Sequence, residues 1–244
     1  MKPSDSTMYV LLTGTGSGLG SALVSALHRR SVPVVAFSRS TPPDVAVGEG
    51  SGGPAPIRYE QGDVTEVGRT SFVLERLLRE WGPPALVVHN ASVLKYRGPL
   101  WLEPEESVRE TLSVNLIAPM LWVSLLTPAM MQAGVGGHLF LSSGVGRHPR
   151  PDWGSYAVSK RAIEAFSDNL SLELPHPLFS LTFNPGPVAT EMRRKAYPER
   201  DPATPRTPQQ AAEIFSDLLP SLLGPEGRRF NGKRLDLEKM EELH

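Results

Sequence analysis

Four glycines fall within the seven residues 14–20, between a short apolar run at 8–13 and a helical pattern over about 19–30. The apolar run predicts a strand, and the spacing of the later apolar residues predicts a helix. A strand, a glycine-rich turn and a helix form the setting in which a dinucleotide pyrophosphate binds, because glycines admit the backbone close to the phosphates and helix amides face their charge. A turn that only packs the helix onto the strand is the alternative at this point.

The spacing of these glycines indicates which class of phosphate-containing ligand the loop binds. The segment fits Thr-Gly-x-x-x-Gly-x-Gly and lacks the Lys-Ser or Lys-Thr ending of a nucleoside triphosphate loop. A dinucleotide is therefore the predicted ligand, with contacts from Gly14, Ser17, Gly18, Leu19 and Gly20.

Beyond this loop, short apolar runs continue to alternate with longer helical patterns, which is typical of repeated β-α units around a parallel sheet. The predicted strands cover residues 8–13, 33–37, 57–60, 85–89, 138–142, 179–183 and 233–236. The predicted helices cover about 19–30, 66–81, 103–133, 153–174 and 208–223. We expect a single α/β domain over residues 1–244, with residues 1–7 as a flexible lead-in. Its fold should be a doubly wound Rossmann type, with a mostly parallel seven-stranded sheet and helices on both faces.

Composition and charge exclude several classes of partner. Hydrophobic residues make up 40% of the chain, enough for a sizeable core, and the net charge of −1 offers no general field for nucleic acid or an anionic membrane. The chain has no cysteine, which excludes disulfides, thiolate metal sites and cysteine nucleophiles, and we expect no metal. The longest apolar run, 116–131, has 16 residues, fewer than the roughly 20 that span a bilayer, and the start does not resemble a signal peptide. We expect a cytoplasmic protein without nucleic-acid or membrane partners.

Glycine and proline, present 22 and 24 times, gather in particular loops. Residues 41–56 hold too many helix breakers for the crossover helix that would normally follow the second strand, so we expect an irregular loop there. The segment 185–208 is long for a loop in a compact domain, which is typical of a binding loop or lid. Within it, Met192 and Tyr197 either close over a substrate or belong to an ordered surface loop.

The end of the second strand indicates which dinucleotide binds. NAD sites usually carry a carboxylate there for the ribose hydroxyls, whereas NADP sites carry an arginine for the 2′-phosphate. Here the residues are Ser38, Arg39 and Ser40, with no acid among them, and a guanidinium offers a planar fork suited to phosphate. We predict NADP(H); the alternative is that Arg39 is an ordinary surface charge.

Tyr156 and Lys160 are four residues apart in a predicted helix, which places both side chains on one face. A neighbouring ammonium favours the phenolate and lowers the pKa of a tyrosine, which would make Tyr156 a better acid or base near neutrality. Ser143 ends a predicted strand at the sheet edge where doubly wound folds build their sites, and its hydroxyl is placed to orient a carbonyl. An exposed helix pair without function is the alternative for a tyrosine and a lysine at this spacing.

Taken together, these motifs make the chain resemble the short-chain dehydrogenase/reductase family over essentially its whole length. The matching segments are the loop from Thr13 to Gly20, Asp63-Val64, His89-Asn-Ala-Ser92, Asn115 in Ser-Val-Asn-Leu, Ser143 with Tyr156 and Lys160, and Pro185-Gly-Pro-Val-Ala-Thr190. Two residues depart from the family pattern, since His89 and Ser92 stand where the family has asparagine and glycine. We treat both as variations that leave Asn90 and Ala91 in place.

The resemblance implies a role for each matched residue. Tyr156 would be the acid/base, Lys160 would lower its pKa and hold the nicotinamide ribose, and Ser143 would position the substrate oxygen. Asn115 would support a water relay to Lys160. The further implied cofactor contacts are Asp63 and Val64 to the adenine, Asn90 and Ala91 on the adenosine side, and Pro185, Gly186, Val188 and Thr190 to the nicotinamide. In the reductive direction, hydride would pass from the nicotinamide to a carbonyl carbon while Tyr156 protonates the oxygen.

Substrate, assembly and two other functions stay open. The expected substrate is a small carbonyl or alcohol compound, and Trp153 either lines its pocket or only packs the helix. The resemblance implies a homodimer or homotetramer formed through the two long predicted helices at 103–133 and 153–174. One other function is that of a non-catalytic NADP-binding regulatory protein of the same fold, which the intact Ser143, Tyr156 and Lys160 argue against. The other is a sugar-nucleotide epimerase or dehydratase, which usually has a longer C-terminal region and a different glycine spacing.

Overall fold

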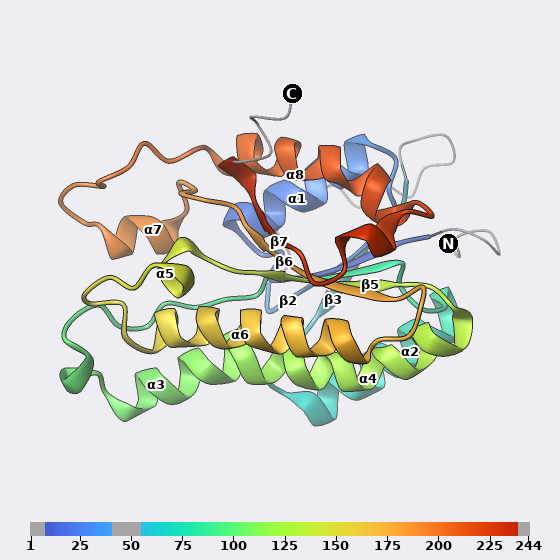
Figure 1. Cartoon of the computed structure of the whole chain (residues 1–244), viewed down its shortest axis with the longest axis horizontal. Helices are drawn as coiled ribbons and strands as arrows, with labels where there is room; N and C mark the ends of the chain where they lie inside the picture. The colour runs from blue at the N-terminus through green and yellow to red at the C-terminus, as the bar shows by residue number, and fades with distance from the viewer. Residues whose placement is uncertain (1–7, 41–54, 239–244) are drawn as a thin grey trace.

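The computed structural model of the chain describes residues 8–40 and 55–238, which are arranged around one seven-stranded sheet (Figure 1). The strands are β1 (Val10–Thr13), β2 (Val34–Ser38), β3 (Ile57–Gln61), β4 (Leu86–His89), β5 (Gly137–Leu141), β6 (Phe179–Asn184) and β7 (Arg234–Asp236). Their order is β3-β2-β1-β4-β5-β6-β7, and every pairing between them is parallel. The predicted Rossmann-type fold is confirmed.

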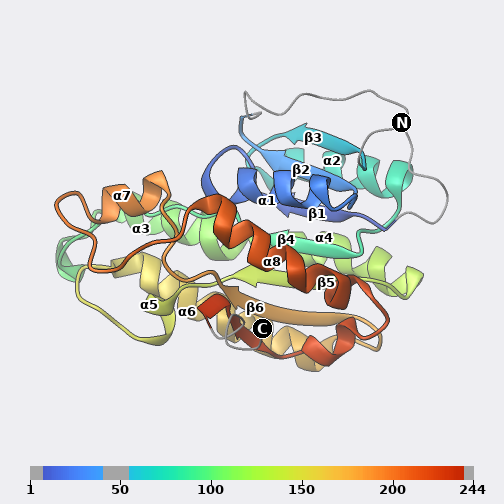
Figure 2. The same ribbon diagram turned by 90° about the horizontal axis from the view of Figure 1, so that it is seen from above.

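Helices cover both faces of this sheet (Figures 1 and 2). They are α1 (Gly18–Arg29), α2 (Val67–Trp81), α3 (Glu105–Leu112), α4 (Ala118–Ala133), α5 (Gly144–Arg147), α6 (Gly154–Glu173), α7 (Glu191–Ala196) and α8 (Pro208–Leu223). Helices α1 and α8 lie on one face, and α2, α4 and α6 lie on the other. Because both faces are covered, the central strands are buried throughout and read as continuous apolar runs.

Two hydrophobic cores result, one on each face of the sheet. Leu27 of α1 and Phe215 of α8 pack with Leu12 of β1 in the first core, and Trp122 of α4 packs with Leu11 in the second. The ring of Trp122 meets Phe37 of β2 edge to face, with 4.9 Å between the ring centroids. These cores hold the strands in register, so that their carboxyl ends form one edge.

The helical stretch 105–133 is long and apolar enough to cross a membrane by length and composition alone. It packs here as a layer of the fold, with Trp122, Leu126 and Met130 at most 1% exposed in the second core. The sequence pattern predicted one helix from residue 103, whereas the helix begins at Glu105 and passes through a π-helical turn, Ser113–Ile117, before α4. A turn of this kind is typical of functional sites.

Several further segments differ from the predictions or lie outside the described residues. The short helices α5 and α7 were not predicted, and α7 lies inside the segment 185–208 that was expected to be a loop. Glu103 does not begin a helix; its carboxylate accepts hydrogen bonds from the Ser155 backbone amide (2.8 Å) and hydroxyl (2.5 Å) at the start of α6. The predicted lead-in at 1–7 and all but the last two residues of the predicted loop at 41–56 lie outside the described residues.

The sheet also fixes where a site can form. The chain turns from β1 to β2 and β3 on one side, then returns to β4 on the other side of β1. At such a switch point the loops after the two central strands diverge and leave a crevice at their carboxyl ends, which is where doubly wound folds bind ligands.

Candidate active site

A cavity of about 600 Å³ opens at the carboxyl ends of the strands, along the switch point. Every residue that the sequence assigned to the cofactor lines it, as does Ser143. These residues come from the glycine loop, the ends of β2, β3 and β4, helix α6 and the segment after β6. Asn115 alone among the predicted site residues is not part of its lining.

The glycine loop forms one wall of the cavity, and its geometry requires glycine. Gly14 has φ +72°, and a Cβ atom there would lie 2.6 Å from the Cα of Ala91. A Cβ at Gly20 would lie 2.1 Å from the Gly14 carbonyl oxygen. Glycine at these positions therefore lets the loop pack directly on the segment after β4 and on itself, the tight turn that a pyrophosphate-binding loop requires.

Asn90 holds this loop against the end of β4. Its amide donates to the carbonyls of Thr13 (2.9 Å) and Gly14 (3.0 Å). The Thr13 hydroxyl oxygen in turn accepts from the backbone amides of Asn90 and Ala91, both at 3.1 Å. A Cβ at Gly18 would come within 3.1 Å of the Thr190 methyl carbon, so a larger residue at this position would press on the segment after β6.

Arg39 lies at the outer end of the cavity with 69% of its side chain exposed. Its guanidinium is 4.0 Å from the Asp63 carboxylate. Although partial burial acts to raise the pKa of Asp63, hydrogen bonds from Thr65 and the charge of Arg39 lower it below the usual range. The end of β2 thus presents a cation and two hydroxyl groups and no carboxylate, which suits an anionic group on the ribose.

Tyr156, Lys160 and Ser143 meet at the other end of the cavity. Tyr156 and Lys160 are 9% and 4% exposed. The Ser143 side chain is hydrogen-bonded to the Tyr156 hydroxyl. The Lys160 ammonium donates to the Leu141 carbonyl (2.8 Å) and lies 5.6 Å from the centroid of the Tyr156 ring.

The two titratable side chains are both strongly affected by burial. Burial raises the pKa of Tyr156 to about 12, against smaller lowering effects of the Ser143 hydrogen bond and the Arg193 charge. Burial also lowers the pKa of Lys160 to about 8. The predicted lowering of the Tyr156 pKa is therefore wrong in direction, because the loss of solvent outweighs the Ser143 hydrogen bond and the Arg193 charge. Tyr156 keeps its proton at neutral pH, the form needed to protonate a carbonyl oxygen.

Asn115 lies in the π-helical turn and is 3% exposed. Its carbonyl oxygen accepts from the Val93 amide (2.8 Å) and the Ser92 hydroxyl (3.1 Å), and its amide donates to the Val93 carbonyl (2.9 Å) and the Ser159 hydroxyl (3.1 Å). All four hydrogen-bonding positions of the side chain are used. Asn115 therefore joins the segment after β4 to α6 through its side chain.

The two departures from the family pattern have structural partners. Ser92 bonds to Asn115, as described above. His89 Nε2 lies 3.1 Å from His138 Nδ1, and the His89 ring stacks on Phe140 with 4.5 Å between centroids. Burial lowers the pKa of His138 to about 3 and that of His89 well below its usual value, so both rings are neutral. Asn90 and Ala91 keep their places beside this pair.

Beyond Tyr156 the cavity becomes apolar. Its lining there includes Leu94, Trp153, Met192 and Ala196. Trp153 both lines the cavity and packs, since its ring lies 5.5 Å from that of Tyr156. Tyr197 is not part of the lining but meets the Trp153 ring edge to face at 5.9 Å. Met192 lies in α7 and lines the cavity, whereas Tyr197 follows α7 and packs on Trp153, so the two interpretations given for them stay open.

Arg97 contacts the apolar end of the cavity, and the sequence did not predict it as a residue of the site. Its guanidinium lies 4.3 Å from the centroid of the Trp153 ring and donates to the Asp152 carbonyl (2.9 Å). Because the contact joins segments more than 50 residues apart in the sequence, no local sequence pattern could have predicted it. Arg97 fixes the orientation of the indole that faces the cavity.

Comparisons with known proteins all find dehydrogenases, reductases or other oxidoreductases. A family model described as short chain dehydrogenase matches residues 8–201. The uncharacterized oxidoreductase YciK of Escherichia coli is 32% identical over 155 residues, which cover 62% of this chain and 59% of that protein. Carbonyl reductase (NADPH) 2 of Sus scrofa is 28% identical over 228 residues, which cover 91% of this chain and 90% of that protein. A short chain dehydrogenase from Escherichia coli, crystallised with NADPH, has a TM-score of 0.80 at 26% identity and covers 95% of this chain and 97% of its own.

Proposed function

The chain belongs to the short chain dehydrogenase family, and we propose that it is an NADP(H)-dependent oxidoreductase acting on a carbonyl or alcohol group. The observation that carries the proposal is the meeting of Ser143, Tyr156 and Lys160 at one end of a cavity whose other end is the glycine loop. A cofactor lying along the cavity would span from Arg39 to Tyr156. The NADPH complex of the Escherichia coli structure and the name of the Sus scrofa relative support this cofactor.

The chain's own residues supply binding, orientation and a proton. When bound, NADPH supplies the hydride. Ser143 holds the carbonyl oxygen beside Tyr156, and the Tyr156 hydroxyl donates its proton to that oxygen. The Lys160 ammonium stabilises the phenolate left behind, because it is buried close to the ring. The raised pKa keeps Tyr156 protonated at neutral pH, which is the form that the reductive direction uses.

The substrate that fits best is an uncharged carbonyl compound with an apolar or aromatic group. The wall beyond Tyr156 is made by Leu94, Trp153, Met192 and Ala196. Arg193 also lines the cavity, but its guanidinium is paired with the Asp201 carboxylate through two contacts, at 2.5 and 2.6 Å, which offset its charge. A flat indole beside the proton donor favours stacking of an aromatic ring.

Arg39→Ala is expected to weaken NADPH binding and to leave NADH binding unchanged. A hydrogen bond between charged groups contributes about 1.5–3 kcal/mol, and because Arg39 is 69% exposed the expected loss is at the lower end, about 10-fold. Dissociation constants for both nucleotides measure the effect, with Arg69→Ala on the exposed surface of α2 as a matched control. Equal affinity of the unaltered protein for NADH and NADPH would contradict the assignment of NADP(H).

We extend the proposal to self-association. Ile117, Met120 and Leu121 on and just before α4 and Val158 on α6 are apolar and 38–54% exposed. Apolar side chains of this kind on two long helices suit a homodimer or homotetramer formed through α4 and α6. A cytoplasmic location stays a prediction, supported by the lack of cysteine.

A further inference from the structure

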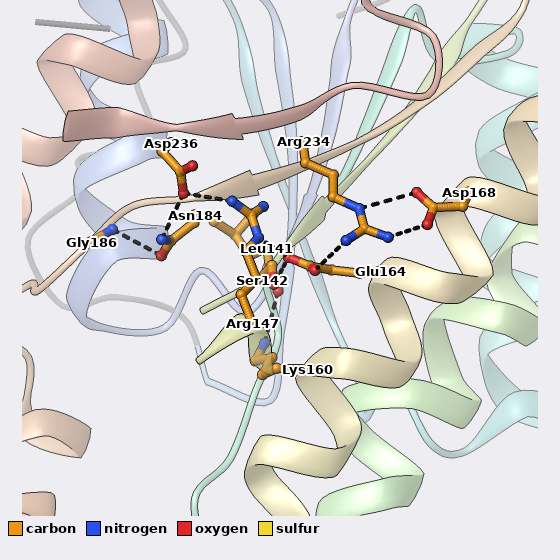
Figure 3. A network of polar contacts seen from close by, with 10 residues as sticks. All are labelled: Leu141, Ser142, Arg147, Lys160, Glu164, Asp168, Asn184, Gly186, Arg234 and Asp236. Atoms are coloured by element: carbon orange, nitrogen blue, oxygen red, sulfur yellow. Dashed lines mark hydrogen bonds and ion pairs between the residues drawn. The ribbon is translucent and has the colours of Figure 1, made fainter. Parts of the chain in front are cut away.

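Behind the catalytic residues lies a cluster of charged side chains that the proposed reaction does not use (Figure 3). At its centre is Glu164 of α6, which is 0% exposed. The Glu164 carboxylate accepts hydrogen bonds from the Ser142 hydroxyl and from Arg147 Nε of α5, both at 2.6 Å. Its second oxygen lies 3.4 Å from the Arg234 guanidinium.

From Arg147 the contacts continue toward the next two strands (Figure 3). Arg147 Nη1 donates to the Asp236 carboxylate of β7 at 2.7 Å. The same Asp236 oxygen accepts from the Asn184 side-chain amide at the end of β6 (2.9 Å). The Asn184 side-chain oxygen, Oδ1, then accepts from the backbone amide of Gly186 (3.1 Å). We call Ser142, Arg147, Glu164, Asn184 and Asp236 the Glu164 cluster.

Each end of the Glu164 cluster borders a residue of the candidate active site. Ser142 directly precedes Ser143, and Glu164 follows Lys160 by one helical turn on α6. Gly186 belongs to the segment after β6 that lines the nicotinamide end of the cavity. The contacts therefore run from the residues that hold the substrate oxygen and the ammonium to the loop on the opposite wall.

Stability alone does not account for charges at this place. Burying a carboxylate and a guanidinium costs free energy because both lose their hydration, and well-packed apolar side chains of similar volume are often as stabilising. The cluster is not fully satisfied either, because Arg147 Nη2 and the second Glu164 oxygen are buried without a hydrogen-bond partner. Charged partners add geometric specificity, because each charge-assisted hydrogen bond fixes an angle as well as a distance.

We propose that Glu164, Arg147 and Asp236 are positioning residues that set the nicotinamide-binding segment at Gly186 relative to Ser143 and Lys160. The inference rests on the proposed function. The proposal requires that loss of one charge shifts the segment at Gly186 relative to Ser143 and Lys160 without unfolding the protein. Misplacement by about 1 Å can cost on the order of 100-fold in rate, so small shifts have a measurable effect.

The test replaces one charge at a time by its amide, as Glu164→Gln and Asp236→Asn. Each variant is titrated with NADPH and with adenosine 2′,5′-bisphosphate, which carries the 2′-phosphate and lacks the nicotinamide. We expect NADPH binding to weaken by about 10-fold and kcat to fall by about 10- to 100-fold, while the bisphosphate binds as it does to the unaltered protein. Asp217→Asn is the control, because Asp217 also pairs with an arginine, Arg30, but lies on α8, is 49% exposed and has no contact with the cluster among the described residues.

The double variant adds a second criterion. Both substitutions act through Arg147, so the loss in the double variant should be smaller than the sum of the single losses in free energy. If Glu164→Gln does not fold, Asp236→Asn carries the test alone, since Asp236 is 19% exposed. Unchanged NADPH binding and kcat in a folded variant would overturn the proposal, and so would equal weakening of both ligands. Failure of the unaltered protein to bind either ligand would instead overturn the proposed function.

Discussion

Tyr156→Phe is expected to reduce turnover by about 10²- to 10⁴-fold, the usual contribution of a positioned proton donor. The substitution removes only the hydroxyl that is hydrogen-bonded to Ser143, and the ring keeps its packing against Trp153. NADPH binding should stay within about twofold of the unaltered protein, because a single hydroxyl contributes little to a ligand of this size. Steady-state kinetics and a fluorescence titration with NADPH measure the two quantities.

Tyr197→Phe is the matched control for this experiment. Tyr197 also contacts Trp153, at 5.9 Å between ring centroids, but does not line the cavity. Its variant should keep the activity of the unaltered protein. Turnover by Tyr156→Phe at the unaltered rate would show that the proton comes from another group.

Lys160→Met is expected to lower kcat by about 10- to 1,000-fold. An ammonium close to a phenolate shifts the pKa by about 1–3 units, and each unit corresponds to about 1.4 kcal/mol. Methionine has a similar length and suits a side chain that is 4% exposed, so the fold should be retained, although the Leu141 carbonyl loses its donor. The exposed neighbour Arg161 gives the control, as Arg161→Met.

The pH dependence of turnover by the unaltered protein tests the role of the Lys160 ammonium independently. Burial lowers the pKa of Lys160 to about 8, so the charge is present below that pH and is lost above it. Reductive turnover should therefore fall as the pH rises through about 8, and the Lys160→Met variant should lack this step. An unaltered profile in the variant would remove Lys160 from the mechanism.

Much of the fold could be predicted from the sequence, because buried parallel strands appear as uninterrupted apolar runs. The run 85–89, for example, contains β4 (Leu86–His89), and the cavity lining comes from motifs at the ends of strands together with Tyr156 and Lys160 of α6. The helices α5 and α7 have four and six residues, too few to show helical periodicity. The π-helical turn at 113–117 interrupts a helix without any glycine or proline inside it.

The electrostatics of the site could not be predicted in the same way. The spacing of Tyr156 and Lys160 indicates that they are neighbours, but burial, which decides the direction of both pKa shifts, depends on the whole fold. Glu164 and Arg147 are 17 residues apart and Arg147 and Asp236 are 89 apart, so their contacts arise only when three strand ends meet. The sequence offers no local sign of such contacts.

The most direct measurement uses NADPH that carries deuterium at the transferred position of the nicotinamide, together with a panel of aldehydes, ketones and diketones. The proposed function predicts that nicotinamide absorbance falls, that substrates with an aromatic group react best, and that the product alcohol carries one deuterium at the carbinol carbon. If the protein binds NADPH but forms no labelled alcohol from any member of the panel, it is a non-catalytic NADP-binding protein and the proposed function is contradicted.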